Sequence, residues 1–423
     1  MALPVIRTTR GVVKPAEQKP SITLDLSAID RLPVLRCNAR TLHVFRYGPD
    51  ASLVIRKALS RALVSYYPLA GRLIQSEHGP LQIECSGEGV WFVEASASCT
   101  LASVNYFDDV ESIPYDDLLP DPETEDVEPL VKMQVTHFRC GGFVIGLIFC
   151  HSVCDGLGAA QFLKAIGEVA RGLEKPSIAP LWHRDFFPST PDEETVAALP
   201  KLPPGPPPMP EYELEHANMD IPIDHVHRLK QEFQEITGQN CSAFQIVAAG
   251  FWISRTRAIN FSPNTQVKLV FFANCRQLLN PPLPEGFYGN CFFPVTITIP
   301  SESLTQRSII EVIKLIQEAK ARLPAEFGKY LKGEHRKDGE DPFAPPLTYT
   351  TLFISEWGRL GFNEVDYQWG PPVHVVPIQG SSIIPVGIVG SLPLPRKGIR
   401  LMTWCVEEAH RGPFLDQISS WTN

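Results

Sequence analysis

A histidine at the end of an apolar run is the residue in this chain best placed for proton transfer. His151 directly follows the eight residues Phe143 to Cys150, a length typical of a buried strand, and the glycine-punctuated stretch after it predicts a turn. Because histidine has an unperturbed pKa near neutrality, a ring fixed between a strand and a turn can accept and return a proton. We therefore predict that His151 faces a cleft and acts as a general base.

Asp155 lies four residues after His151, and its carboxylate has two possible roles. It could hydrogen-bond the imidazole and fix its tautomer, as in a catalytic triad, or it could pair with a cation and hold the turn. In a helix this spacing would put both residues on one face, as for two metal ligands. Gly156 and Gly158 argue against a regular helix there, and no third ligand follows at suitable spacing, so we expect no metal.

Two thiols beside the histidine leave a covalent route as a weaker alternative. Cys150 and Cys154 flank His151, but proximity along the chain does not establish reach across an active site. We therefore prefer a role for His151 as a general base over a covalent intermediate on either thiol.

Length and composition are those of an ordinary globular protein with more than one core. The chain has 423 residues, of which 44% are hydrophobic and 20% charged. The net charge of -9 disfavours nucleic acid or an anionic membrane as a partner. Ten cysteines form no CxxC pair, which suits a reducing compartment. Arg7 and Arg10 interrupt the first residues and no apolar run approaches the ~20 residues of a membrane span, so we expect a cytoplasmic protein without a signal peptide.

The elements that must position His151 alternate between strands and helices in both halves of the chain. Strands are predicted at residues 5–13, 41–45, 81–85, 90–94, 133–138, 143–150, 267–273, 292–299, 351–355, 373–378, 386–389 and 401–406. A first helix is predicted between Asp50, as its cap, and Pro68, and a second at 159–171. In the second half, one helix is predicted to run up to Ile236, with Gly238 ending it, another to begin after the capping residue Ser242, and a last one to span 304–323. The acidic residues 108–128 are expected to form a solvated loop. A proline-rich linker at 189–212 is expected to separate domains at 1–188 and 213–423.

Two short motifs then point to a family. His151-Ser-Val-Cys-Asp155-Gly156 resembles the HxxxD signature of the BAHD acyltransferases, plant enzymes that move an acyl group from coenzyme A to an alcohol or amine. Asp366-Tyr-Gln-Trp-Gly370 is similar to the family's second signature, Asp-Phe-Gly-Trp-Gly, with Tyr367 and Gln368 departing from it. Further matches follow in family order: Tyr67-Pro-Leu-Ala-Gly-Arg72, Cys85-Ser-Gly-Glu-Gly89, Phe92-Val-Glu-Ala95, Asn274-Cys-Arg276 and Phe287-Tyr-Gly-Asn290.

The resemblance implies an α/β fold and a set of architectural residues. It predicts two similar chloramphenicol-acetyltransferase-like domains, each a mixed β-sheet with flanking helices, with an active-site channel between them and a segment near 371–395 joining the first sheet. It implies that Asp155 pairs with Arg276, and that Asp366, Trp369 and Gly370 are structural. It also implies a monomer that uses acyl-CoA as co-substrate, a small-molecule acceptor and no permanently bound cofactor.

Ser242 is a candidate for contact with CoA, because helix N-termini favour anions, but a plain capping role is equally compatible with the sequence. Relatives that use shikimate or quinate carry an arginine directly after the Trp-Gly pair, where this chain has Pro371, so the resemblance favours an uncharged acceptor. Leu42 and Val44, placed near the acceptor pocket by the resemblance, are apolar and fit an aromatic alcohol.

Three segments, at residues 286–291, 318–325 and 370–374, are most similar to the grass transferases that move p-coumaroyl or feruloyl groups to monolignols, and less so to benzoyl and taxane acyltransferases. A hydroxycinnamoyl transfer to a neutral aromatic alcohol is therefore the leading hypothesis. Amide formation from an amine and a non-catalytic binding role remain as alternatives.

Overall fold

The computed structural model describes residues 4–18, 21–75, 79–121, 128–186, 212–334, 341–344, 347–378 and 384–422. The linker predicted at 189–212 lies outside the described residues except for Tyr212. No helix among the described residues is long and apolar enough to cross a membrane.

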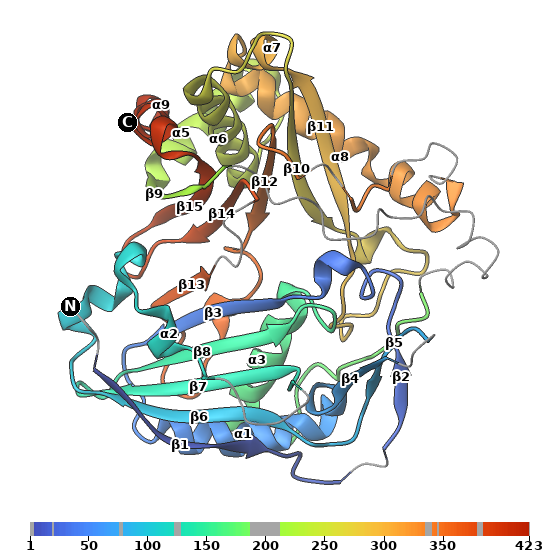
Figure 1. Cartoon of the computed structure of the whole chain (residues 1–423), viewed down its shortest axis with the longest axis vertical. Helices are drawn as coiled ribbons and strands as arrows, with labels where there is room; N and C mark the ends of the chain where they lie inside the picture. The colour runs from blue at the N-terminus through green and yellow to red at the C-terminus, as the bar shows by residue number, and fades with distance from the viewer. Residues whose placement is uncertain are drawn as a thin grey trace.

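The first body of the molecule is built on a mixed six-stranded sheet. Its strands lie in the order β1 (Val5–Val13), β6 (Val90–Ala97), β7 (Val131–Phe138), β8 (Phe143–Cys150), β3 (Asn38–Phe45) and β13 (His374–Ile378). Only β6 and β7 pair in parallel; the other neighbours are antiparallel. Helices α1 (Ala51–Ser65) and α3 (Gly156–Ala170) pack on this sheet through an apolar cluster shared with β8 (Figure 1).

The second body repeats this plan. Its sheet has the order β11 (Phe292–Pro300), β10 (Gln266–Asn274), β12 (Thr351–Glu356), β14 (Val386–Ser391), β15 (Gly398–Val406) and β9 (Glu215–Pro222). Strand β12 pairs in parallel with both β10 and β14, so this sheet is also mixed. Its helices are α5 (Ile223–Thr237), α6 (Ala243–Ile259), α7 (Ser301–Thr305), α8 (Ile309–Leu331) and α9 (Glu408–Thr422). Two mixed α/β sheets confirm the predicted fold class.

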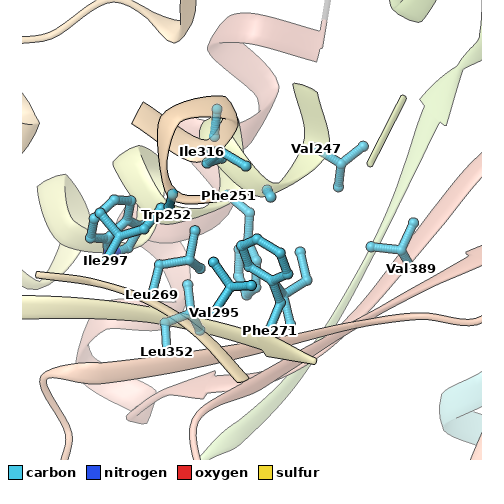
Figure 2. Packing of buried hydrophobic residues seen from close by; sticks show 14 of the residues in the cluster. Val247, Phe251, Trp252, Leu269, Phe271, Val295, Ile297, Ile316, Leu352 and Val389 are labelled. Carbon is cyan, nitrogen blue, oxygen red and sulfur yellow. The ribbon is translucent and has the colours of Figure 1, made fainter. Parts of the chain in front are cut away.

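The core of the second body lies between α6, α8 and the sheet, as Figure 2 shows. Phe251 and Trp252 of α6 have no exposed surface, and Ile316 of α8 faces them above Leu269 and Val295 of the sheet. Burying a side chain of this size stabilises a fold by roughly 1.5–3 kcal/mol. This packing fixes β10 and β11, the strands that reach the site described below.

Smaller elements complete the chain. A three-stranded sheet joins β2 (Thr23–Asp25), β5 (Leu81–Glu84) and β4 (Arg72–Gln75), and α2 (Tyr115–Leu118) lies over the first large sheet. Short 3-10 turns occur at Pro33–Leu35, Tyr67–Ala70, Ala102–Phe107, Val110–Ser112, Arg276–Leu278 and Phe362–Glu364.

One strand crosses from the second half of the chain into the first sheet. Strand β13 pairs antiparallel with β3, with His374 opposite Val44 and Ile378 opposite Arg40 (Figure 1). The predicted range for this crossing, 371–395, is too long, because β14 already belongs to the second sheet. The crossing closes what would otherwise be the open edge of β3.

Several local predictions are wrong, each for a physical reason. The acidic stretch is not a fully solvated loop, since Val110 and Leu118 are buried. The helix predicted at 304–323 is two helices, because the Ser308 side chain accepts a hydrogen bond from the Glu311 main chain and starts α8 anew. Asp50 precedes α1 in a left-handed conformation and its side chain makes no capping hydrogen bond. Strands β2 and β4 and helix α9 were not predicted.

A buried neutral histidine on β3 ties the stability of the first sheet to pH. The His43 Nε2 atom lies 2.8 Å from the Thr41 hydroxyl, and burial lowers the pKa of His43 to about 3. The folded pKa is therefore below the unfolded value of ~6.5, so the unfolded chain binds the proton first. The contribution to stability is complete above the unfolded pKa and is lost as the pH falls below it.

We predict that lowering the pH from 7.5 to 5.5 reduces the unfolding free energy of the parent by about 1.4 kcal/mol more than that of the His43→Gln variant, since glutamine cannot take up the proton. Denaturant titrations of both proteins at the two pH values measure this difference. His374 and His216, whose pKa values burial lowers to about 4, contribute to the slope that remains. Parallel pH profiles for the two proteins would show that His43 does not contribute.

Candidate active site

The main chain of His151 is held from both sides at the end of β8. Its N–H donates to the Cys37 carbonyl at 2.9 Å, and its carbonyl accepts from the Asn290 amide nitrogen at 2.8 Å. The pairing of β8 with β3 adds to these contacts, because Cys150, the residue before His151, lies opposite Asn38 of β3. The His151 side chain is half-buried, and its Nδ1 atom has no hydrogen-bond partner among the described residues. The structure thus fixes the backbone of the histidine and leaves its ring to other contacts.

A buried polar network stands behind Asn290. Asp30 Oδ1 accepts from the Asn290 side chain at 2.7 Å, and Asp30 Oδ2 lies 2.9 Å from Arg184 Nε. Asp30 and Asn290 have no exposed surface, and Arg184 lies over the Trp182 ring at 4.1 Å. Because a buried carboxylate is stable only with compensating partners, this network holds Asn290 rigidly against His151. The sequence shows Asn290 only as the last residue of a motif, and it shows no signal for Asp30 or Arg184.

Asp155 serves the helix and the second body of the molecule. Its Oδ1 accepts from the main chain of Gly158 at 3.0 Å, which caps α3, and from Arg276 at 2.8 Å. Arg276 also donates to the Gly289 carbonyl at 2.7 Å. Burial alone lowers the pKa of the Arg276 guanidinium, but the charge of Asp155 outweighs this and raises it. In the described part of the chain no hydrogen bond joins Asp155 to the His151 ring, so the geometry favours the structural role over the triad.

The glycines after His151 are needed for space. His151 and Asp155 do not share a helix, as predicted, because residues 151–155 form a turn; helix α3 begins at Gly156, three residues earlier than expected. A Cβ atom at Gly158 would lie 1.8 Å from the Tyr288 carbonyl oxygen, and one at Gly156 would lie 2.6 Å from the Leu360 side chain. The Tyr288 main chain can approach α3 this closely only because Gly158 lacks a side chain.

The second signature forms a turn that packs on the first sheet. Asp366 Oδ1 accepts from the main chain of Gln368 at 2.8 Å and of Gly370 at 2.9 Å. The Trp369 ring meets Phe143 edge to face at 5.9 Å. Gln368 has a φ of 90°, a conformation that favours glycine, so the departure from the family motif places strain at that position. The turn is stabilised despite this conformation, because the Asp366 carboxylate accepts hydrogen bonds from two of its main-chain amides.

The neighbouring thiols are poorly suited to a covalent role. Burial raises the pKa of Cys150 to about 11 and raises that of Cys154 well above its usual value. Since the thiolate is the nucleophile, both cysteines are almost entirely protonated near neutrality. These raised pKa values disfavour the covalent alternative.

The remaining predicted site residues have plain structural surroundings. The Ser242 hydroxyl accepts from the Gln245 main chain at 3.2 Å, in a full capping box at the start of α6. Pro371 is exposed. Leu42 and Val44 have no exposed surface, because alternation along β3 directs them into a core shared with Val144 and Ile388. They are core residues and do not line an open pocket, which corrects that prediction.

Two aromatic rings flank the histidine, one from each body. The Phe149 ring centroid lies 6.3 Å from the His151 ring, and that of Phe292 lies 6.5 Å away at an interplanar angle of 77°. Phe292 is the first residue of β11, so His151 stands where the two bodies meet. A half-buried histidine at such a junction is placed to exchange a proton with a substrate that enters between them.

Fold and site together define a protein of two mixed-sheet bodies with a histidine at their junction. The model of the Transferase family matches residues 3–384. The chain is 42% identical to Acyl transferase 4 of Oryza sativa subsp. japonica, with 100% of both chains covered. It is 38% identical to the myricetin 3-O-glucosyl 1,2-rhamnoside 6'-O-caffeoyltransferase AT2 of Crocosmia x crocosmiiflora, again over the full length of both.

The solved structure of vinorine synthase superposes with a TM-score of 0.72 at 19% identity, covering 99% of this chain and 100% of that one. This likeness supports the fold alone. The family match and the full-length relatives show that the chain belongs to the BAHD family of acyl-CoA-dependent acyltransferases, whose co-substrate is a CoA thioester.

We predict that Asp155→Asn lowers the unfolding free energy by about 3–5 kcal/mol, because it leaves the Arg276 guanidinium without its charged partner. Denaturant unfolding measures this loss, and turnover per folded molecule should fall by a smaller factor. Asp416→Asn, at an exposed position of α9, is the matched control and should change stability by less than about 0.5 kcal/mol. A stable Asp155→Asn protein with a large loss of turnover would instead support the triad role.

Proposed function

We propose that His151 is the general base of a direct acyl transfer from a CoA thioester to the hydroxyl group of a small acceptor. The observation that carries this proposal is the clamped backbone of His151 at the junction of the two bodies. A thioester is already activated, so the remaining obstacle is the weak nucleophilicity of a neutral hydroxyl. A base within ~3 Å of that hydroxyl overcomes it.

The proposed steps keep every proton on a named group. The His151 ring accepts the hydroxyl proton while the acceptor oxygen forms its bond to the thioester carbonyl carbon. The tetrahedral intermediate then collapses, the carbon–sulfur bond breaks, and the imidazolium returns its proton to the departing thiolate. Ester and free CoA are the products, and the histidine ends in its starting state.

The other site residues are proposed to act through structure. Asp155 and Arg276 hold α3 and the His151 turn against the second body, and Asp366, Trp369 and Gly370 hold the second signature on the first sheet. Ser242, at the N-terminus of the 17-residue helix α6, is proposed to contact CoA in addition to its capping role. Among the described residues of the site, none is proposed to form a covalent intermediate.

For the substrates we propose an aromatic acyl group of the hydroxycinnamoyl type and a neutral aromatic alcohol such as a monolignol. The caffeoyl donor named for the Crocosmia relative supports the acyl class. Pro371 supports a neutral acceptor, because it stands where relatives that use shikimate or quinate carry an arginine, and it supplies no cation for a carboxylate. Amine acceptors and benzoyl or acetyl donors are the alternatives, and one matrix of acyl-CoAs against alcohols and amines, with products identified by mass, distinguishes them.

We predict that His151→Ala reduces acyl transfer by about 10²–10⁴-fold while the unfolding midpoint and CoA affinity stay near those of the parent. Release of free CoA, followed with a thiol reagent, measures the rate. His227→Ala, an exposed histidine of α5, is the matched control and should keep full activity. Transfer by His151→Ala within a few-fold of the parent would exclude the histidine as the base.

We predict that coniferyl alcohol exceeds shikimate in kcat/KM by about 10–100-fold with one acyl donor, since the contact of a carboxylate with a cation contributes roughly 1.5–3 kcal/mol. The Pro371→Arg variant supplies the missing cation and should narrow this ratio by a similar factor. Equal specificity constants in the parent would mean that another cation receives the carboxylate, and our acceptor assignment would then be wrong.

A further inference from the structure

A pair of phenylalanines continues the aromatic surroundings of His151 into the second sheet. Phe292 begins β11, and its ring meets that of Phe272 on the neighbouring strand β10 at 5.2 Å and 73°, edge to face. The Phe343 ring centroid lies 6.1 Å from that of Phe292, and Phe343 is 5% exposed. We call Phe292 and Phe272 the phenylalanine pair.

Phe272 is the more exposed member of the pair and lies on the opposite face of β10 from the core residue Phe271. Phe271 is 3% exposed and packs in the core of the second body, whereas Phe272 is 43% exposed. An apolar ring of this size in water loses the stabilisation that burial would provide, so its surface is available for contact with a ligand.

The face of β10 that carries Phe272 is turned toward the first body. Side chains two residues apart on a strand share a face, so Phe272 lies on the same face as Val270. Val270 is in register with Phe353 of β12, and Phe353 packs against the cluster that contains Val44 of the first body. Phe292 is in register with Asn274, two residues after Phe272, so both phenylalanines share this face, and the Phe292 ring lies 6.5 Å from that of His151.

We infer that the phenylalanine pair binds an aromatic ring of the substrate and thereby selects aromatic over saturated substrates. The inference rests on the function proposed for His151, because the reacting hydroxyl then lies within ~3 Å of that ring. The Phe292 centroid is 6.5 Å from the His151 ring. A substrate ring two or three bonds from the reacting carbon would reach the 4.5–7 Å separation at which aromatic pairs attract edge to face. This chemistry is common to an aromatic acyl group and an aromatic alcohol.

Two pairs of substrates test the inference, because each pair differs only in whether its ring is aromatic. The first arm compares benzoyl-CoA with cyclohexanecarbonyl-CoA on one alcohol, and the second compares benzyl alcohol with cyclohexylmethanol on one acyl-CoA. Phe292→Leu and Phe272→Leu keep an apolar side chain and remove the ring. We expect the aromatic-to-saturated ratio of kcat/KM to fall about threefold to tenfold in one arm, which identifies the part of the substrate that the pair contacts.

Tyr47→Leu is the matched control. Tyr47 is 56% exposed, and its side chain lies beside Gly141 of the turn between β7 and β8. The length of β8, ~25 Å, separates this turn from His151, so replacing Tyr47 should leave both ratios unchanged. Dissociation constants of S-benzyl-CoA and S-cyclohexylmethyl-CoA repeat the donor comparison without turnover. Phe272→Leu changes an exposed side chain, so it decides the question even if Phe292→Leu does not fold.

The inference would be overturned if the folded variants kept the aromatic-to-saturated ratio of kcat/KM in both arms, whether their activity stayed the same or fell equally with aromatic and saturated substrates. Either result leaves the role of His151 standing, because that role is tested by the His151→Ala rate. Conversely, an active His151→Ala protein would exclude the base, while a shift of the dissociation-constant ratio in the phenylalanine variants would still show ring recognition.

Discussion

The carboxylate of Asp155 is shared between the first turn of α3 and the guanidinium of Arg276, and the architecture around the histidine depends on this sharing. One oxygen caps a helix of the first body and at the same time anchors a residue that follows β10 in the second. Arg276 extends the contact to the Gly289 carbonyl, next to the asparagine that holds His151. Because Arg276 compensates the charge of Asp155, this ion pair can join the two bodies at a position that is mostly buried.

This arrangement separates two tasks that a catalytic triad combines. In a triad the carboxylate both orients the imidazole and stabilises its charge. Here Asp155 contacts the first turn of α3 and Arg276, and the Nδ1 atom of His151 has no hydrogen-bond partner among the described residues. A proton held briefly between an alcohol and a departing thiolate does not require a lasting counter-charge, so such a site is compatible with the proposed transfer.

The sequence predicted those parts of the molecule that rest on local patterns. The apolar run before His151, the capping serine of α6 and the glycine after α5 each specify an element through nearby residues, and all three occur as predicted. Contacts between distant residues carried no such signal. The approach of Tyr288 to Gly158 explains a glycine inside a helix, yet only the folded chain brings the two together. For the same reason Asp30 and Arg184 were not anticipated, and Leu42 and Val44 were assigned to a pocket although they lie in the core.

The strand that crosses between the sheets has a consequence for how the protein can be divided. Without β13 the long strand β3 would present a row of unpaired amides and carbonyls, which is a template for association with other chains. A fragment ending before the linker would therefore expose β3 as an unpaired edge strand, prone to association, even if its helices and remaining strands folded. The two halves form an interlocked pair, and any split or permuted version of the enzyme would have to keep residues 374–378 with the first sheet.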